Sequence, residues 1–216
     1  MTTVSRSNPL DDPNASVRVQ AALQAGVDPT TVPVEALIER CGVEPDFFVR
    51  DMLTWALTRH PPDVVVPRLL DELTSPAPQA RSQALHSLSK IGDRRAWPSV
   101  FGGLLHDADE EVARSAWRAA VALVPHGSEG ALAAELVHDL GRGGSELQRS
   151  LSRALVALGD AAAPVLADAA ATGSVDTRAH AMATAHLLQD PDSGFAPALE
   201  EAKRLAILGR DPIPGT

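Results

Sequence analysis

The apolar and polar positions of the chain follow a repeating pattern, in which an apolar residue, an arginine and small or apolar residues return at helical spacing. Three copies are close, and they read Val17-Arg18-Val19-Gln20-Ala21, Val49-Arg50-Asp51-Met52-Leu53 and Ala80-Arg81-Ser82-Gln83-Ala84. Three looser copies begin at Val112, Leu147 and Thr177. The intervals between first positions are 32, 31, 32, 35 and 30 residues, a period typical of helical repeat proteins. The longest interval contains Gly141-Arg142-Gly143-Gly144, which we interpret as a loop insertion.

A series of prolines indicates the same period independently. Its members are Pro33, Pro67, Pro98, Pro164 and Pro197, with spacings of 34, 31, 66 and 33 residues. Proline is tolerated in the first turn of a helix because its missing N–H would have no partner there. Each repeat is therefore predicted to have a first helix at the arginine pattern and a second helix that opens near a proline.

These patterns predict six helix pairs. We expect the first helices at residues 14–25, 46–59, 77–91, 109–124, 145–158 and 175–188, and the second helices at 33–41, 62–73, 96–106, 129–140, 161–171 and 195–208. Candidate helix N-caps precede several first helices: Asp46, Ser75, Asp107, Ser145 and Ser174. Chain reversals are expected at glycines: Gly26, Gly92, Gly127, Gly159 and Gly209. Residues 1–12 and 210–216 are predicted to be tails of a single domain that spans residues 13–209.

The repeat unit resembles a HEAT repeat, of the short kind also named for phycobilisome lyases. The stretch from Gln79 to Pro98 is the copy most like that family's pattern, and the resemblance covers nearly the whole chain. It implies an all-α fold, a right-handed α–α superhelix of the HEAT and armadillo kind. It also implies that the second helices line the concave side. Most HEAT arrays bind partners and only a few are enzymes, so the resemblance favours a binding protein.

The composition agrees with close helix packing. The chain has 36 Ala and 26 Leu among its 216 residues, but only 3 Trp, 4 Phe and no Tyr. Alanine and leucine favour helices, whereas strands prefer aromatic and β-branched residues. Arginine outnumbers lysine 17 to 2, which with the alanine content is typical of a GC-rich bacterial genome and carries no functional weight.

The charge and the single cysteine exclude several classes of protein. The net charge of −9 argues against general nucleic-acid binding, which requires a basic surface. Cys41 is alone, so neither an internal disulfide nor a cysteine-based metal cluster is expected, and we interpret it as a buried structural residue. No apolar run approaches the roughly 20 residues of a membrane span. The N-terminal residues lack the apolar segment of a signal peptide, and we expect a cytoplasmic protein without membrane contact.

Enzymatic HEAT proteins offer two patterns against which the chain can be compared. Those that resemble deoxyhypusine hydroxylase carry repeated His-Glu pairs that hold iron, and this chain has none. His106-Asp107 and His138-Asp139 are the nearest approximations, and we interpret their aspartates as helix caps or solvated charges. The DNA-alkylation-repeat glycosylases need a basic channel, which the acidic second helices do not provide. The sequence therefore predicts no catalytic residue, no metal site and no cofactor.

One set of charged side chains stands out. If the first residue of each pattern faces the core, positions 3 and 7 of the first helices point outward at 100° per residue. In the fourth and fifth repeats these positions hold Arg114, Arg118, Arg149 and Arg153, and the second and third repeats place Asp51, Trp55, Ser82 and His86 there. This stripe is either a solvated face neutralised by neighbouring glutamates or a docking patch for an acidic partner.

Other side chains carry further expectations. Trp55 and Trp117 are expected either to pack between repeats or to contribute to the partner surface, whereas Phe47 and Phe48 are expected in the core or as a staple between repeats. The arginines of the repeat pattern are predicted to bond aspartates of neighbouring loops. These are Arg18, Arg50, Arg81 and Arg178.

The sequence favours a non-enzymatic HEAT-repeat scaffold or adaptor with a protein partner. Its partner-binding residues are predicted to be Arg114, Arg118, Arg149, Arg153, Trp55, His86 and Trp117. Two alternatives stay open at this point. The groove could bind a small ligand or nucleic acid, or the chain could be a HEAT enzyme of the DNA-glycosylase kind.

Overall fold

The computed structural model describes residues 8–190, 192 and 194–208. The predicted tail 210–216 and the predicted turn at Gly209 lie outside these residues. Within them the chain forms two compact units by their internal contacts. Unit 1 comprises the described residues up to Val100 together with Glu111–Leu123, and unit 2 comprises Phe101–Glu110 and the described residues after Leu123. The single domain over 13–209 stays a prediction.

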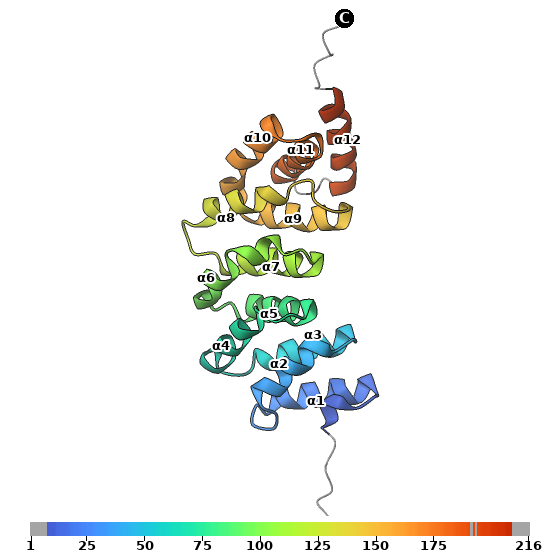
Figure 1. The fold of residues 1–216 in the computed structure, drawn as a ribbon, viewed down its shortest axis with the longest axis vertical. Helices are drawn as coiled ribbons and strands as arrows, with labels where there is room; N and C mark the ends of the chain where they lie inside the picture. Colours follow the sequence, from blue (N-terminus) through green and yellow to red (C-terminus); the bar gives the residue numbers. More distant parts are fainter. Residues whose placement is uncertain (1–7, 191, 193, 209–216) are drawn as a thin grey trace, which may run out of the picture. The chain divides into compact units, whose positions relative to one another are not determined.

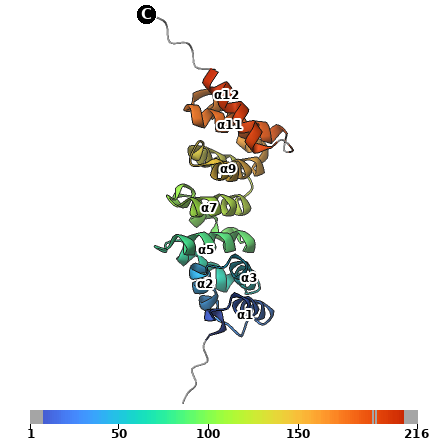
Figure 2. The same ribbon diagram turned by 90° about the vertical axis from the view of Figure 1, so that its right-hand side faces the viewer.

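Unit 1 consists of helices that alternate in direction (Figures 1 and 2). They are η1 (Pro9–Asp11), α1 (Ala15–Val27), α2 (Val34–Val43), α3 (Phe47–Leu57), α4 (Pro62–Glu72), α5 (Pro78–Ile91), η2 (Arg94–Ala96), α6 (Trp97–Val100) and α7 (Glu110–Leu123), where η marks a 3-10 helix. The first helices of successive repeats contact one another, α1 with α3 and α3 with α5. In Figure 1, α4 and α6 lie on the other side of this unit from the row of first helices.

Unit 2 continues the alternation. Its elements are η3 (Gly103–His106), α8 (Glu129–Leu136), η4 (Val137–Asp139), α9 (Ser145–Ala157), η5 (Gly159–Ala162), α10 (Ala163–Thr172), α11 (Val175–Gln189) and α12 (Phe195–Leu208). Helix α11 lies at its centre, in contact with α9, α10 and α12. The described residues contain no β-strand, and the predicted all-α fold of consecutive helix pairs is confirmed.

The first helices begin and end within two residues of the predicted positions. Two of the predicted caps fix helix starts with their side chains, because Asp46 accepts from the N–H groups of Phe48 and Val49 and Ser174 accepts from that of Thr177. Asn14, which was not predicted, caps α1 in the same way. Gly92 ends α5 with a φ of 72°, a left-handed conformation that favours glycine. Two other predicted caps, Ser75 and Ser145, do not cap a helix with their side chains. Asp107 accepts from the N–H group of Asp109 at 2.9 Å, just before α7.

Three predictions about local structure were wrong. The expected helix at 96–106 is broken into the four residues of α6 and the 3-10 turn η3, because Gly102 takes a φ of 155° that other residues rarely adopt. Gly26 lies inside α1 rather than at a chain reversal. The tail expected at 1–12 is structured in its described part, since η1 buries Leu10.

Small residues bring helices of the same unit close together. Ala84 of α5 and Ala116 of α7 are both buried. Ser82 and Ser115, on the same two helices, share a buried hydrogen bond of 3.1 Å between their hydroxyl groups. Cys41 is buried as predicted, and burial raises the pKa of its thiol to about 12. These contacts leave the outward positions of α3, α5 and α7 for the candidate site.

The arginines of the repeat pattern hold the loops that precede their own helices. Three of the four, Arg18, Arg50 and Arg81, donate to the main-chain oxygens six and five residues earlier. The pairs of acceptors are Asp12 and Pro13 for Arg18, Glu44 and Pro45 for Arg50, and Ser75 and Pro76 for Arg81. The predicted bond to an aspartate of a neighbouring loop is therefore wrong for Arg50, and Arg18 pairs instead with the carboxylate of Glu44. For Arg81 and Arg178 it stays a prediction. A planar guanidinium with several donors suits two adjacent carbonyls.

Candidate functional site

The predicted stripe forms part of a groove in unit 1, across α3, α5 and α7. The groove has a volume of about 240 Å³. It is lined by Phe47, Arg50, Asp51, Ser82, Gln83, His86, Glu111, Arg114, Ser115 and Arg118. Five of these ten stand at positions that the helical register predicted to point outward: Asp51, Ser82, His86, Arg114 and Arg118. For Ser82 this prediction is wrong, because its side chain is buried against Ser115. The structure thus brings residues from three successive repeats into one surface.

Arg114 and Arg118 lie one turn apart on α7 and are only partly satisfied. Arg114 Nη1 pairs with Glu111 Oε1 at 2.7 Å. Arg118 Nε donates to the Arg114 carbonyl at 3.2 Å. The Nε of Arg114 is buried and has no hydrogen-bond partner among the described residues. A buried donor without an acceptor is unfavourable, so the hydrogen-bonding capacity of Arg114 is not fully used within the described residues.

The electrostatics of the groove favour an anionic ligand. Partial burial and the neighbouring Arg114 lower the pKa of the Arg118 guanidinium. Burial, with smaller contributions from Lys90 and Arg118, also lowers the pKa of His86, against an opposing effect of Asp51. Both shifts mean that the local surroundings disfavour positive charge. An anionic group in the groove would relieve this repulsion, although the chain as a whole is acidic.

Two exposed aromatic side chains form the rim of the groove, and the sequence analysis wrongly assigned them to the core. Phe47 and Phe48 are 66% and 73% exposed, and their rings meet edge to face at 5.8 Å. The guanidinium of Arg50 lies 5.9 Å from the centre of the Phe47 ring, within the range of a cation–π contact. Their place directly after the Asp46 cap, on the first turn of α3, is the signal that could have indicated exposure.

The two tryptophans of the predicted surface have different positions. Trp55 is 36% exposed, and its ring packs on Gly26 of α1, where a Cβ atom would overlap it. Trp117 is fully buried within unit 1. The assignment of Trp117 to a partner surface is therefore wrong, and the alternative of internal packing holds for it.

Arg149 and Arg153 belong to unit 2, where they border a separate cavity of about 540 Å³. The other walls are formed by Val156, Ala157, Leu187, Gly194, Phe195, Ala196 and Pro197. Arg149 also pairs with Glu146 at 3.4 Å. Each arginine pair is thus placed within its own unit, and a single surface of four arginines stays a prediction.

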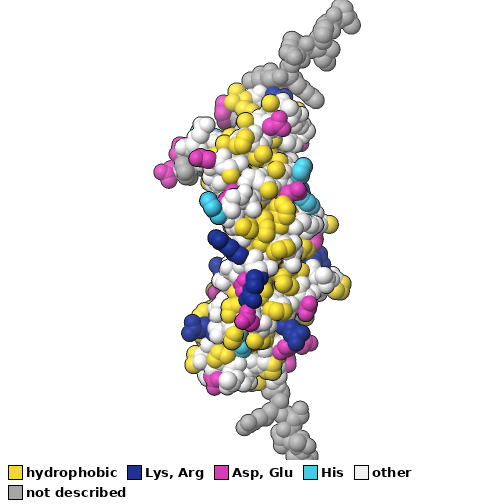
Figure 3. Space-filling view, turned by 90° about the vertical axis from the view of Figure 1, so that its left-hand side faces the viewer, with side chains coloured by type: hydrophobic (Ala, Val, Ile, Leu, Met, Phe, Trp, Pro, Cys, Tyr) yellow, Lys and Arg dark blue, Asp and Glu magenta, His cyan; other side chains and the backbone are white. Residues whose placement is uncertain are grey.

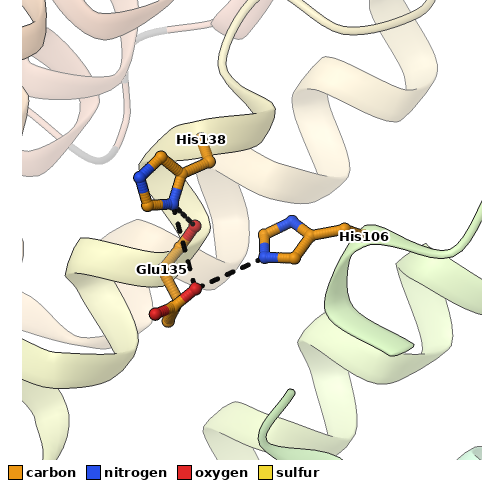
Figure 4. A group of neighbouring side chains, drawn as sticks. All are labelled: His106, Glu135 and His138. Carbon is orange, nitrogen blue, oxygen red and sulfur yellow. Dashed lines mark hydrogen bonds and ion pairs between the residues drawn. The ribbon is translucent and has the colours of Figure 1, made fainter. Parts of the chain in front are cut away.

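A third group, also in unit 2, consists of His106, Glu135 and His138 (Figure 4). One ligand-type atom of each lies within 4.8 Å of the other two. His106 Nε2 is 3.4 Å and His138 Nδ1 is 3.9 Å from Glu135 Oε2. The sequence analysis missed this group, because it considered His106 and His138 only with the aspartates that follow them. Histidine side chains are visible on the surface of this unit in Figure 3.

No single helix of residues 8–190, 192 and 194–208 combines the length and the apolar character of a membrane span. Only a bent pair, Ser145–Ala157 with Gly159–Thr172, meets both criteria when its two helices are taken together, and it bends by 119°.

Comparisons with known proteins bear on the fold. Residues 34–122 match the family described as HEAT repeats. No curated protein matches the chain. Among solved structures, the chain is similar to an engineered protein from the Northeast Structural Genomics Consortium, with 21% identity, a TM-score of 0.48, and coverage of 93% of this chain and 94% of the other. The finer resemblance to the short repeats named for phycobilisome lyases stays a prediction. Residues 34–122, which extend from α2 through most of α7, therefore resemble HEAT repeats, and this match is consistent with the repeat family that the sequence predicts.

Proposed function

We propose that the protein is a non-enzymatic scaffold or adaptor that docks an acidic segment of a partner protein in the groove of unit 1. HEAT repeats typically mediate protein interactions. The observation that carries the proposal is the pairing of an exposed aromatic rim with a positively charged groove. Exposed aromatic residues and arginines contribute most of the binding energy in many interfaces, and here Phe47, Arg114 and Arg118 line one surface.

The groove fits a segment that presents both a carboxylate and an apolar side chain. The carboxylate would accept from the guanidinium groups of Arg114 and Arg118, which line the groove. The apolar side chain would pack on Phe47 and Phe48, which are exposed in the unbound protein. Binding of this kind both buries apolar area and neutralises charge. Added salt should therefore weaken the affinity, and the apolar contact should maintain some binding at high salt.

The test uses a fluorescent peptide composed of glutamate and phenylalanine, with a lysine and phenylalanine peptide as the opposite-charge probe. Fluorescence polarisation should show binding of the acidic peptide alone, with weaker binding at higher salt. Arg114→Glu with Arg118→Glu should raise the Kd about tenfold or more, which corresponds to at least about 1.4 kcal/mol. Phe47→Ser with Phe48→Ser should weaken binding at high salt as well.

The matched control is Arg68→Glu with Arg94→Glu, which changes the net charge of unit 1 by the same amount at exposed positions outside the groove. This variant should bind like the parent. If it weakens binding as much as the groove variant does, the peptide responds to overall charge and the docking site is wrong. If neither peptide binds at low salt, the proposed partner chemistry is wrong.

The cavity of unit 2 supports a second candidate function, the binding of a small amphipathic anion. Its volume of about 540 Å³ falls in the range of small-molecule sites. Apolar side chains, among them Leu187 and Phe195, form the walls beside Arg149 and Arg153. A medium-chain fatty acid is the probe. Calorimetry should show that the fatty acid binds the parent protein and that the double variant Arg149→Gln with Arg153→Gln loses this binding. Equal affinity of the parent and the double variant would exclude this function.

A further inference from the structure

We infer that His106, Glu135 and His138 form a binding site for one Zn²⁺ ion in unit 2. The three residues come from two parts of the chain, η3 and the α8–η4 turn, and one ligand-type atom of each lies within 4.8 Å of the other two. Two histidines and one carboxylate are also the protein ligands of many zinc sites, in which water occupies the remaining position. Nothing in the proposed docking function requires this site.

The orientation of His106 supports the inference. Its Nδ1 atom hydrogen-bonds Asp139 Oδ2. A carboxylate can only accept, so Nδ1 carries the proton and the neutral ring presents the lone pair of Nε2. That lone pair faces Glu135 Oε2 at 3.4 Å, so two acceptors point at each other. Such a contact is stable only if a proton or a metal cation lies between the two atoms.

Asp139 is well placed to orient the ring of His106. It is buried, and its second oxygen accepts from Arg142 at 2.9 Å. Arg142 is itself fixed by a hydrogen bond to the carbonyl of Asp107. A carboxylate that accepts from the far nitrogen of a metal-binding histidine is a common feature of zinc sites, where it sets the tautomer and the ring direction. This support exists here before any metal binds.

The distances require only small movements. Zinc bonds of about 2.0–2.1 Å with tetrahedral angles place ligand atoms about 3.3 Å apart. The His106–Glu135 distance already matches, and the His138–Glu135 distance of 3.9 Å is slightly long. His138 Nδ1 also lies 3.1 Å from the Glu135 carbonyl, which the metal would replace as its partner. The ring of His138 is 69% exposed and is free to turn toward the ion.

A bound ion would link consecutive helix pairs within unit 2. His106 precedes Glu135 by 29 residues and is held on η3, whereas Glu135 and His138 lie one turn apart. An ion that binds the folded state alone stabilises it in proportion to the logarithm of its concentration over the Kd. Zinc should therefore raise the melting temperature, and chelation should lower it to that of the metal-free protein.

The experiment uses the full, untagged chain after dialysis against a chelator. Calorimetric titration with ZnCl₂ near neutral pH should give one ion per chain, and Co²⁺ should give the visible absorption of a tetrahedral site that zinc then removes. His138→Ala should weaken zinc binding at least tenfold. This exposed position should not affect folding, which circular dichroism would verify. Asp139→Asn tests the positioning role and should weaken binding about 10- to 100-fold.

His126→Ala is the matched control, since His126 is fully exposed and pairs with Glu129 at 3.5 Å without a second histidine in the group. This variant should bind zinc like the parent. If the parent does not bind zinc, or if His138→Ala and His126→Ala bind it equally well, the inference is overturned. The contact between His106 and Glu135 would then be held by a proton on Nε2.

Discussion

Arg142 donates a hydrogen bond to the main-chain oxygen of Asp107, 35 residues earlier in the chain. A longer contact of 3.4 Å reaches the oxygen of Ala108. In three other repeats the oxygens at the same two positions accept from the arginine of the repeat pattern, but the fourth repeat has Ala113 in place of that arginine. The glycine-rich loop thus supplies, from the next repeat, the donor that the fourth repeat lacks.

Arg142→Ala should destabilise unit 2 by about 2–4 kcal/mol, because it removes both this bond and the partner of the buried Asp139 carboxylate. Arg149→Ala, in an exposed ion pair with Glu146, is the control and should cost less than about 1 kcal/mol. Urea denaturation of the two variants measures the difference. Equal midpoints would show that the loop contributes no more than a surface ion pair.

The sequence predicts those parts of the fold that depend on local chemistry. The apolar period and the caps define the first helices to within two residues, because the signals act within one helical turn. The position of Gly26 could not be predicted from local signals. Its role is set by the ring of Trp55 from the following repeat, a long-range contact that no local pattern encodes, so a glycine inside a helix was mistaken for a turn.

Gly26→Ala tests this contact. Although alanine favours helices more than glycine does, the new methyl group would overlap the Trp55 ring, and we expect a loss of about 1–3 kcal/mol from overpacking. Gly130→Ala, inside α8 with no atom within 4 Å of its new Cβ, should be stabilising by roughly 0.5–1 kcal/mol. Thermal melts of both variants should therefore shift in opposite directions, and a stabilised Gly26→Ala would contradict the packing.

In the candidate site, too, the sequence predicted only the positions that depend on local helical periodicity. Helical periodicity placed His86, Arg114 and Arg118 on one outward surface, since residues three and four apart share a helix face. The same reasoning could not find the group around His106, because it depends on a distance between side chains 29 residues apart in the chain. Phe47 was misassigned for a different reason. An apolar residue in the first turn of a helix can face either way, and hydrophobicity alone does not decide.

The helical register of α5 and α7 can be tested by enlarging a buried alanine on each helix. Ala84 and Ala116 are 2% and 0% exposed, so Ala84→Leu and Ala116→Leu should each cost about 1–3 kcal/mol through overpacking. Val64→Leu, at an exposed position of α4, is the control and should change stability by less than about 0.5 kcal/mol. Chemical denaturation gives all three values. Unchanged midpoints for the alanine variants would mean that the predicted helical face is wrong.

The buried His180 should make stability fall as the solution becomes acidic. Gly141 N–H donates to its Nδ1 at 3.0 Å, and its Nε2 lies 3.0 Å from the Gln148 carbonyl and 2.9 Å from Ser152 Oγ. These partners suit the neutral ring with its proton on Nε2. Burial lowers the pKa of His180 from 6.5 to about 4, although the Gln148 carbonyl opposes the shift.

Because the pKa is lower in the folded state, the unfolded chain binds a proton first as the pH falls through 6.5. The stabilisation is complete above that value and is lost progressively down to about pH 4. For this one residue the loss amounts to roughly 3 kcal/mol. The carboxylate of Glu44 acts at lower pH. Its burial would raise its pKa, but hydrogen bonds from Arg18, Asp46 and Arg40 outweigh this and lower the pKa to about 2.

Urea denaturation between pH 6.5 and 4.5 therefore isolates the histidine contribution, since the stabilisation by Glu44 is lost only below 4.5. His180→Gln should be less stable than the parent at neutral pH, because it loses buried hydrogen bonds, and its stability should change less steeply with pH. His60 and His86, whose pKa values are also lowered by burial, are present in both proteins and cancel in the comparison. His126→Gln, at a fully exposed position, should keep the slope of the parent. Parallel slopes for the parent and His180→Gln would show that the buried ring does not resist protonation.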